Sequence, residues 1–307
     1  MSKFQRRITE MASRNESKII LPEYGDKRIQ EASSELELKG FNVIDINDYQ
    51  HKMEYYVEYV KKLPFTCNWP DLQLRKYLSN SLHFSMVMVA CGDADGLVAG
   101  ASTSSSEVIR SAIRIVGINE MSKWVSSIFF LISPCGNHAY TFADCAVMPE
   151  PDPQQLAMIA SDSASFHELL TGEDARVAFL SFSTKGSADH YRVDKVKSAV
   201  SLFKKNFPNI LHDGELQFDA AIIPEISKIK VPNSQIEGCA NVFIFPNLDA
   251  GNIAYKIAQH LGKYSAWGPL LQGLKKPIHD LSRGCSVDDI VNVATITLMQ
   301  SSCHANL

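Results

Sequence analysis

Short apolar runs that alternate with longer amphipathic segments constrain the fold of this 307-residue chain more than any other feature. Several of these runs are hydrophobic almost throughout, which is typical of strands that are buried on both faces of a parallel sheet. We expect strands at residues 18–21, 41–46, 84–91, 126–132, 140–147, 177–182, 220–223 and 242–245.

The longer segments carry apolar residues at helical spacing. We expect helices at residues 27–38, 105–116, 152–170, 188–206, 250–261 and 286–299. Strands that alternate with helices form βαβ units, so the sequence predicts an α/β protein. The length suggests two domains or one large one. Because no linker-like segment marks a boundary, two domains here are expected to be closely coupled.

The charge balance excludes one broad class of function. Lys and Arg total 30 against 34 Asp and Glu, which gives a net charge of −4. A nucleic-acid-binding protein needs a basic surface to displace the counterions of the phosphates, so we expect no such partner. The longest apolar runs are too short to span a bilayer, so we expect no membrane partner either.

The cysteines and the first residues bear on compartment and metal content. Seven cysteines lie at irregular spacing, without a CxxC pair or a Cys/His pattern of the zinc-binding kind. An odd, scattered set indicates reduced thiols and therefore an intracellular protein. The charged segment at the start of the chain lacks the apolar core of a secretory signal. We expect a cytoplasmic protein without a metal site.

Four polar segments follow predicted strands or lead into predicted helices: 92–106, 181–188, 247–252 and 280–289. Ligands of open α/β sheets bind beyond the carboxyl ends of the strands. Each segment alone is also explained by a solvated turn or a helix cap. Their recurrence favours an anion-binding site more than any one of them does.

The last of these segments carries the most specific local pattern. Ser286 and Asp289 have the spacing of a helix capping box, with Asp in place of the usual Glu. Ser282 and Arg283 then lie in the loop that leads into the helix. Backbone N–H groups at a helix N-terminus, together with a guanidinium, suit a phosphate-like anion. The alternative is that Ser286 and Asp289 only cap a helix.

Ordered motifs across nearly the whole chain resemble the phosphate acetyltransferase (phosphotransacetylase) family. The motifs lie at residues 20–23, 92–98, 143–147, 183–188, 214–221, 240–253, 268–274 and 280–286. The resemblance implies the reversible transfer of an acetyl group between coenzyme A and inorganic phosphate. Coenzyme A is then a co-substrate, with acetyl phosphate and phosphate as the other substrates, and no bound cofactor or metal is implied.

The resemblance also implies roles for particular residues. Asp289 takes the proton of the thiol, Ser282 forms a hydrogen bond at the reacting centre, and Arg283 neutralises the phosphate or the developing oxyanion. Arg75 and Arg110 bind the phosphates of coenzyme A and the acyl phosphate. A carboxylate at a helix N-terminus is stabilised in its charged form, which makes it a weaker base.

Further substrate-binding groups are expected in two loops. Ser105 stands where the family usually has Thr and keeps a hydroxyl. Ser183, Thr184 and Lys185 supply hydroxyl and ammonium donors suited to a pyrophosphate, although they also fit a helix N-cap.

Some positions depart from the family pattern or attract attention as reactive groups. Ser111 replaces a usual Pro, Asn247 a usual Asp and His279 a usual Asn. We expect His279 to lie in a surface loop; the alternative is that it tunes the pocket. Cys145 and Cys285 fall within motifs without an evident base partner, so we expect both to be packed, unreactive side chains.

The fold implied by the resemblance has two α/β/α domains with an interdomain cleft, as in isocitrate and isopropylmalate dehydrogenases. Domain I is expected at residues 1–121 plus 272–307, with the Ser-Arg and Asp set, and domain II at 122–271. The resemblance also implies a homodimer.

Three alternatives remain open at this point. A phosphate butyryltransferase shares the fold and the catalytic set and differs in the size of the acyl pocket. A phosphotransacetylase-like module without catalysis senses acyl-CoA. An NAD-linked dehydrogenase of similar architecture needs a nicotinamide fingerprint and metal-binding carboxylates, and the sequence has neither.

Overall fold

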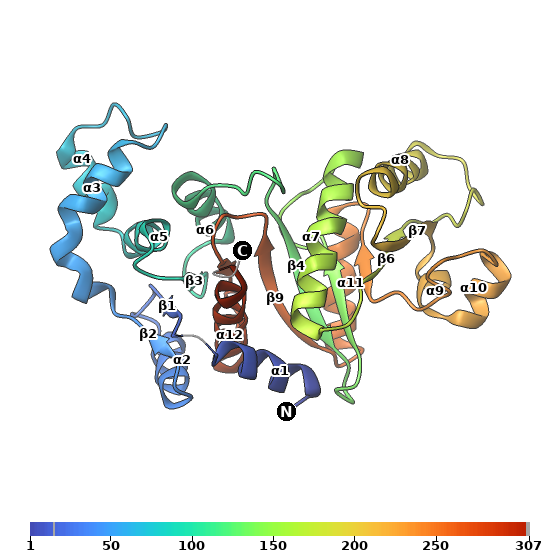
Figure 1. The fold of residues 1–307 in the computed structure, drawn as a ribbon, viewed down its shortest axis with the longest axis horizontal. Coiled ribbons are helices and arrows are strands. Elements are labelled where there is room, and N and C mark those ends of the chain that lie inside the picture. The colour runs from blue at the N-terminus through green and yellow to red at the C-terminus, as the bar shows by residue number, and fades with distance from the viewer. Residues whose placement is uncertain (15, 305–307) are drawn as a thin grey trace. The chain divides into compact units, whose positions relative to one another are not determined.

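A computed structural model describes residues 1–14 and 16–304. The chain forms two compact units, which we call unit A (residues 5–123 and 268–307) and unit B (residues 1–4 and 124–267). A four-stranded and a six-stranded sheet, with helices beside them, confirm the α/β class (Figure 1). Within the described residues, no helix has the length and apolar character required to cross a membrane.

The four-stranded sheet has the strand order β10-β3-β1-β2, and its paired strands are parallel. The strands are β1 (Lys18–Ile20), β2 (Asn42–Val43), β3 (Gly96–Ala99) and β10 (Ile278–Asp280). Because the strands are parallel, the loops 21–26, 100–104 and 281–286 all leave from one side of the sheet. We call this side the carboxyl edge.

Each of these three loops leads directly into a helix. The helices are α2 (Lys27–Leu38), α6 (Ser105–Ser111) and α12 (Val287–His304), and α12 packs against α2 and β3. The π-helical segment η2 (Ala112–Val116) continues α6. The other helices of this part of the chain are α1 (Lys3–Ala12), the 3₁₀-helix η1 (Ile46–Lys52), α3 (Met53–Lys61), α4 (Asp71–Leu78) and α5 (Ser81–Cys91).

The six-stranded sheet has the order β7-β6-β8-β5-β4-β9. Its strands are β4 (Ser126–Ile132), β5 (Ala139–Ala143), β6 (Arg176–Leu180), β7 (Leu211–Leu216), β8 (Val242–Ile244) and β9 (Ser265–Gln272). Strand β4 is antiparallel to β5, whereas β5, β8, β6 and β7 are parallel to one another. The helices of unit B are α7 (Pro153–Thr171), α8 (Tyr191–Asn206), α9 (Phe218–Ile222), α10 (Pro224–Lys230) and α11 (Leu248–His260).

Two predicted strands are wrong. Residues 84–91 lie in helix α5, and residues 220–222 lie in helix α9. Helix α5 is buried along most of its length. Its sequence therefore has no polar face, and its apolar pattern is also that of a buried strand. Its ends carry the missed signals: Asn80 caps the first turn, and Gly92 ends the helix in the left-handed region.

This error changes the position of the polar segment 92–106. Strand β3 lies inside it, so residues 92–95 precede a strand and only 100–104 lie at the carboxyl edge. The prediction that residues 92–96 follow a strand is therefore wrong. By contrast, the predicted bounds of β4 and α2 are confirmed.

Candidate active site

The loop after β10 presents two of the expected groups to solvent. Ser282 and Arg283 are exposed, while Leu281 before them and Cys285 after them are buried. The Cys285 N–H donates to the Ser282 carbonyl at 2.9 Å, which closes the turn. The buried residues anchor the loop, and the hydroxyl and the guanidinium project from it.

The capping box at the start of α12 is confirmed. The Oδ2 atom of Asp289 accepts hydrogen bonds from the Ser286 N–H at 2.9 Å and from the Ser286 hydroxyl at 2.8 Å. In return, the Asp289 N–H donates to Ser286 Oγ at 3.1 Å. The contacts fix the Asp289 carboxylate at the N-terminus of α12, in the turn that follows Ser282 and Arg283.

The loop after β3 is held by a carboxylate of the chain itself. Glu23 Oε2 accepts from the N–H groups of Gly100 and Ala101 at 2.9 and 2.8 Å. Its Oε1 accepts from the Ser102 N–H at 3.0 Å, the Ser102 hydroxyl at 2.9 Å and the Thr103 N–H at 2.7 Å. The sequence leaves a phosphate site and a solvated turn as alternatives for this segment, and in the structure its donors are occupied by Glu23.

The electrostatics of Glu23 fit this role. Burial raises the pKa of its carboxyl, but the hydrogen bonds from Thr103 and Ser102 outweigh burial, and the net shift is downward. Glu23 is therefore charged at neutral pH, and its charge is neutralised by amide dipoles. These bonds fix the loop that leads into α6, the helix that carries Ser105 and Arg110.

The loops after β3 and β10 approach each other at Gly100. This glycine has a φ of +116°, and a Cβ at its position would lie 2.7 Å from the backbone N and O of Leu281. A side chain does not fit there, so Gly100 is required by both conformation and space. The close approach brings the start of α6 beside the loop of Ser282.

Asp280, the last residue of β10, also lies where the loops after β3 and β10 approach each other. It is 1% exposed, and burial raises the pKa of its carboxyl to about 7. Helix α6 packs against β10. Asp280 and Glu23 both fall within the motifs that carry the resemblance, although no local pattern in the sequence marks either as functional.

The two further arginines lie in different settings. Arg110 is exposed on the last turn of α6, which begins at the carboxyl edge. Arg75 lies on α4, which packs against α3 and α5, and its Nη2 donates to Glu54 Oε2 at 2.5 Å. Elements at the carboxyl edge thus carry Ser282, Asp289 and Arg110, whereas Arg75 is paired on a separate helix of unit A.

The candidate loop of unit B is occupied by internal contacts. Ser183 is buried, and its hydroxyl donates to Glu215 Oε1 at 3.0 Å. Lys185 forms an ion pair with Asp213 and donates to the Gly214 carbonyl at 2.8 Å. Thr184 is buried as well. These side chains hold the loop between β6 and α8 together.

The prediction for His279 is wrong. It lies within β10 and is fully buried, because the strand places it inside the unit. Its Nδ1 accepts the Leu271 N–H at 3.0 Å, so Nε2 carries the hydrogen of the neutral ring. Burial lowers the pKa of His279 to about 4. This side chain is a neutral part of the core.

The remaining motif residues have structural roles. Cys145 and Cys285 are buried, as predicted, and burial raises the pKa of both thiols. Asn247 is the N-cap of α11 and accepts the Ala250 N–H at 3.0 Å. The polar segment 247–252 is therefore a helix cap.

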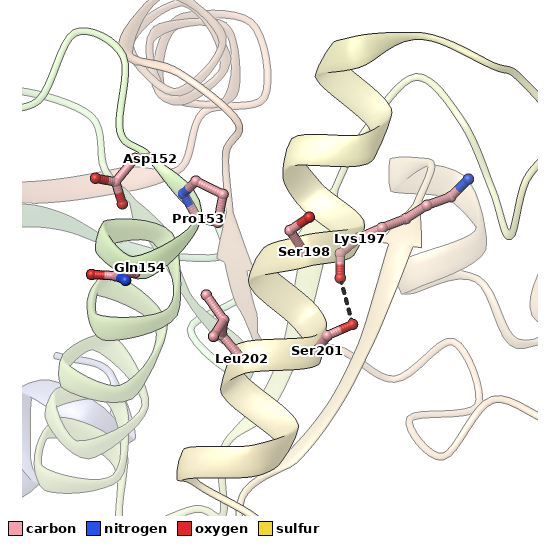
Figure 2. A pocket seen from close by; sticks show the side chains of 7 residues that line it. All are labelled: Asp152, Pro153, Gln154, Lys197, Ser198, Ser201 and Leu202. Atoms are coloured by element: carbon pink, nitrogen blue, oxygen red, sulfur yellow. Dashed lines mark hydrogen bonds between the residues drawn. The ribbon is translucent and has the colours of Figure 1, made fainter.

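Unit B also has an open groove between α7 and α8, with a volume of about 730 Å³ (Figure 2). Its lining residues are Asp152, Pro153, Gln154, Lys197, Ser198, Ser201 and Leu202. The hydroxyl of Ser201 donates to the Lys197 carbonyl at 3.0 Å. None of the residues expected in the active site lines this groove.

Comparison with known proteins adds independent information. The model of the family described as "Phosphate acetyl/butaryl transferase" matches residues 30–298. The chain is 39% identical to the phosphate acetyltransferase of Bacillus subtilis over 320 residues, which cover 96% of this chain and 98% of the relative. It is 41% identical over 280 residues to the phosphate acetyltransferase of Acetivibrio thermocellus, covering 90% of this chain and 84% of that one.

Solved structures give the same result. The EutD phosphotransacetylase from Staphylococcus aureus superposes with a TM-score of 0.85 at 38% identity, covering 97% of this chain and 99% of that one. A phosphotransacetylase from Streptococcus pyogenes superposes with a TM-score of 0.88 at 36% identity, with coverage of 98% and 99%.

Proposed function

The chain belongs to the phosphate acetyl/butyryl transferase family and is a phosphate acetyltransferase, and from this premise we propose that residues 280–289 hold its reacting groups. The reaction exchanges an acetyl group between the thiol of coenzyme A and inorganic phosphate. The observation that carries the proposal is the capping box, which fixes a carboxylate one turn from an exposed Ser-Arg pair.

Asp289 is the proposed base for the thiol. A free thiol has a pKa near 8.5, so only about a few per cent is thiolate at neutral pH, and a nearby base raises the reactive fraction. The bonds from Ser286 are directed at Oδ2 of Asp289. We assign Oδ1 to the thiol, because the capping box then keeps the carboxylate in place while the proton moves.

Ser282 and Arg283 are the proposed partners of the acyl phosphate. When the thiolate attacks the carbonyl carbon, negative charge develops on the carbonyl oxygen, and a positioned hydroxyl stabilises it. A guanidinium binds the oxygens of the departing phosphate in a bidentate manner. The exposed Ser282 hydroxyl and Arg283 side chain supply these two groups from consecutive positions.

Arg110, Ser105 and Arg75 are proposed to bind the substrates. Arg110 and Ser105 lie on α6, which packs against β10. Arg75 is proposed to bind a phosphate of coenzyme A. Its present partner, Glu54, has a side chain that is 74% exposed, so solvent screens this ion pair and it holds Arg75 only weakly. A phosphate can replace a partner held so weakly. Ser183, Thr184 and Lys185 stay a prediction as pyrophosphate ligands.

The test compares two neighbouring aspartates on α12. Asp289→Asn is expected to lower the rate of acetyl transfer by about 10²–10⁴-fold, the usual contribution of a positioned base. Asp288→Asn is the matched control, since Asp288 lies in the same helical turn and is exposed. It should stay within about twofold of wild type. Both acetyl-CoA formation and the coenzyme-A-dependent arsenolysis of acetyl phosphate are measured. The proposal is contradicted if Asp289→Asn is as active as wild type in these assays.

The acyl specificity is tested with the same assay. We propose acetyl phosphate as the preferred substrate, and butyryl phosphate is the closest alternative within the family. Rates measured side by side for acetyl, propionyl and butyryl phosphate identify the preferred chain. A higher kcat/KM for butyryl than for acetyl phosphate overturns the acetyl preference and leaves the roles of Ser282, Arg283 and Asp289 unaffected.

We further propose that the enzyme is a homodimer that contacts its partner through α11. Ile253 and Ile257 on this helix and Leu261 at its C-cap are spaced four residues apart and are 57%, 53% and 81% exposed. A contiguous apolar stripe on a helix is a common contact surface, and a two-fold axis brings the same stripe from each copy together.

The proposed compartment is the cytoplasm. Cys67, Cys135 and Cys239 are exposed free thiols. Exposed thiols persist in a reducing compartment and are prone to oxidation outside it.

A further inference from the structure

We propose that Arg28 is a positioning residue of the transfer reaction: it fixes the loop of Ser282 and Arg283 against the loop that leads into α6. The inference rests on the proposed function of these loops. Arg28 lies in the first turn of α2, outside the motifs that carry the resemblance.

The guanidinium of Arg28 bonds to the backbone of both loops. Its Nη1 donates to the carbonyls of Arg283 and Cys285, each at 2.9 Å. Its Nη2 donates to the carbonyl of Ala101 at 3.0 Å. One side chain therefore bonds to the loop of Arg283, which is 255 positions away in the sequence, and also to the loop of Ala101.

Asp26 sets the direction of this guanidinium. Arg28 Nε donates to Asp26 Oδ1 at 3.0 Å, and Nη2 donates to Oδ2 at 2.6 Å. The same Oδ1 accepts the Arg28 backbone N–H at 2.9 Å as the N-cap of α2. The Arg28 hydrogen bonds are the main cause of the lowered pKa of the Asp26 carboxyl. Asp26 at the start of α2 thus orients the Arg28 guanidinium toward the two loops.

The donor inventory separates this role from substrate binding. A guanidinium has five N–H donors in a fixed plane. Here one bonds to Asp26 Oδ1, one to Asp26 Oδ2, two to the carbonyls of Arg283 and Cys285, and one to the carbonyl of Ala101. All five are used within the protein, so none is left for a phosphate. Arg28 differs in this respect from the exposed Arg283 and Arg110.

The loop before α6 is held from two sides by one short segment of chain. Glu23 accepts its N–H groups from Gly100 to Thr103, and Arg28 donates to its Ala101 carbonyl. The polar groups of this backbone are therefore satisfied by residues between β1 and the first turn of α2. Because the same Arg28 binds the Ser282 loop, one rigid planar group links the two loops beyond the last strand pair, Ala99 with Asp280.

This arrangement predicts an effect on the chemical step. Misplacement of reacting groups by about 1 Å costs about 10²-fold in rate. The Arg283 side chain, which we propose to bind the phosphate, is free to reach its ligand even if its backbone shifts slightly. Loss of the planar Arg28 guanidinium should therefore lower kcat much more than it raises the KM for acetyl phosphate.

The experiment uses Arg28→Lys and Arg28→Ala in the full chain, with Arg14→Lys as the control at an exposed position of unit A. A lysine keeps the charge but lacks the planar fork. We expect Arg28→Lys to lower kcat by about 10–100-fold with the KM for acetyl phosphate within about threefold of wild type. Free guanidinium ion should restore kcat of Arg28→Ala several-fold, and urea should not. Arg14→Lys should match wild type.

A second readout does not depend on activity. Hydrogen exchange should accelerate at the amides of residues 282–285 in Arg28→Lys, with the amides of β1 unchanged. Wild-type exchange in that loop overturns the inference, as does a kcat of Arg28→Lys within twofold of wild type. A raised KM for acetyl phosphate at unchanged kcat overturns it too, because it assigns Arg28 to substrate binding. If the wild-type protein does not transfer acetyl groups, the proposed function fails, and exchange alone then decides whether Arg28 holds the loop.

Discussion

Ser286 and Asp289 hold each other through three hydrogen bonds at the start of α12, two of them to the same carboxylate oxygen. The proposed base is therefore also half of a helix cap. The bonds that cap the helix also hold this carboxylate in one orientation, so its fixed position is part of what Asp289 contributes.

Ser286→Ala is expected to lower both stability and activity. Loss of a capping hydroxyl costs about 1 kcal/mol of folding free energy. Asp289 Oδ2 also loses one of the two donors that fix it, so we expect kcat to fall about tenfold, corresponding to about 1.4 kcal/mol. Thermal unfolding and steady-state kinetics measure the two effects. Ser286→Thr keeps the hydroxyl and should recover most of both losses; wild-type behaviour of Ser286→Ala would exclude this role.

Glu23→Gln is expected to destabilise unit A. An amide oxygen accepts only part of the hydrogen bonds that the carboxylate accepts, and each buried donor left unsatisfied costs about 1–3 kcal/mol. Since the folded pKa of Glu23 is lowered, its stabilisation is complete above the unfolded pKa of about 4.5 and is lost as the pH falls through the folded value. The difference in unfolding free energy between mutant and wild type should be largest at neutral pH and shrink in acid. Glu31→Gln, on the exposed side of α2, is the control; an equal effect of the two substitutions would contradict the prediction.

Asp280→Asn tests the buried carboxyl at the end of β10. Burial raises its pKa to about 7, so the folded state binds this proton more tightly than the unfolded state does. The favourable contribution is complete below the unfolded pKa of about 3.8 and is lost as the pH rises through 7. The mutant should therefore gain stability relative to wild type as the pH rises from 5 to 7, by at most about 3 kcal/mol, since one pKa unit corresponds to about 1.4 kcal/mol, and little more above pH 7. A difference in Tm that does not change over this range disproves the shift.

Ile257→Asp tests the proposed contact surface of the homodimer. Ile257 is the central residue of the stripe on α11, and a charge there opposes burial against a second apolar stripe. We expect the wild-type protein to sediment as a dimer and the mutant as a monomer at the same concentration. Lys256→Asp, at the neighbouring position outside the stripe, should leave the dimer intact. A monomeric wild type, or a mutant that still dimerises, refutes this surface.

Local patterns in the sequence proved informative where a single element decides the structure. The capping box of Ser286 and Asp289 depends on a spacing of three residues and was predicted. Strand β4 was predicted with its bounds from a short apolar run, and all its residues are buried in the structure. Helix α5 has the same composition without a polar face, and only the caps at Asn80 and Gly92 distinguish it from a strand.

Contacts between distant segments could not be predicted in this way. Arg28 and Glu23 bind loops that are 73 to 257 positions away, and only the strand order of the sheet brings these loops together. His279 was misplaced for the same reason: its burial follows from the pairing of β10 with β3. The pairing of Arg75 with Glu54 likewise depends on how α4 packs against α3.

The position of β10 beside β3 has a consequence for folding during synthesis on the ribosome. Ile278 pairs with Leu97, so the row of hydrogen-bonding groups on that side of β3 stays open until residues near 280 have left the exit tunnel. Unit B is nearly continuous in sequence and can fold while the chain is still growing. Unit A has to wait, and during that interval an unpaired strand is exposed to chaperones and to other nascent chains.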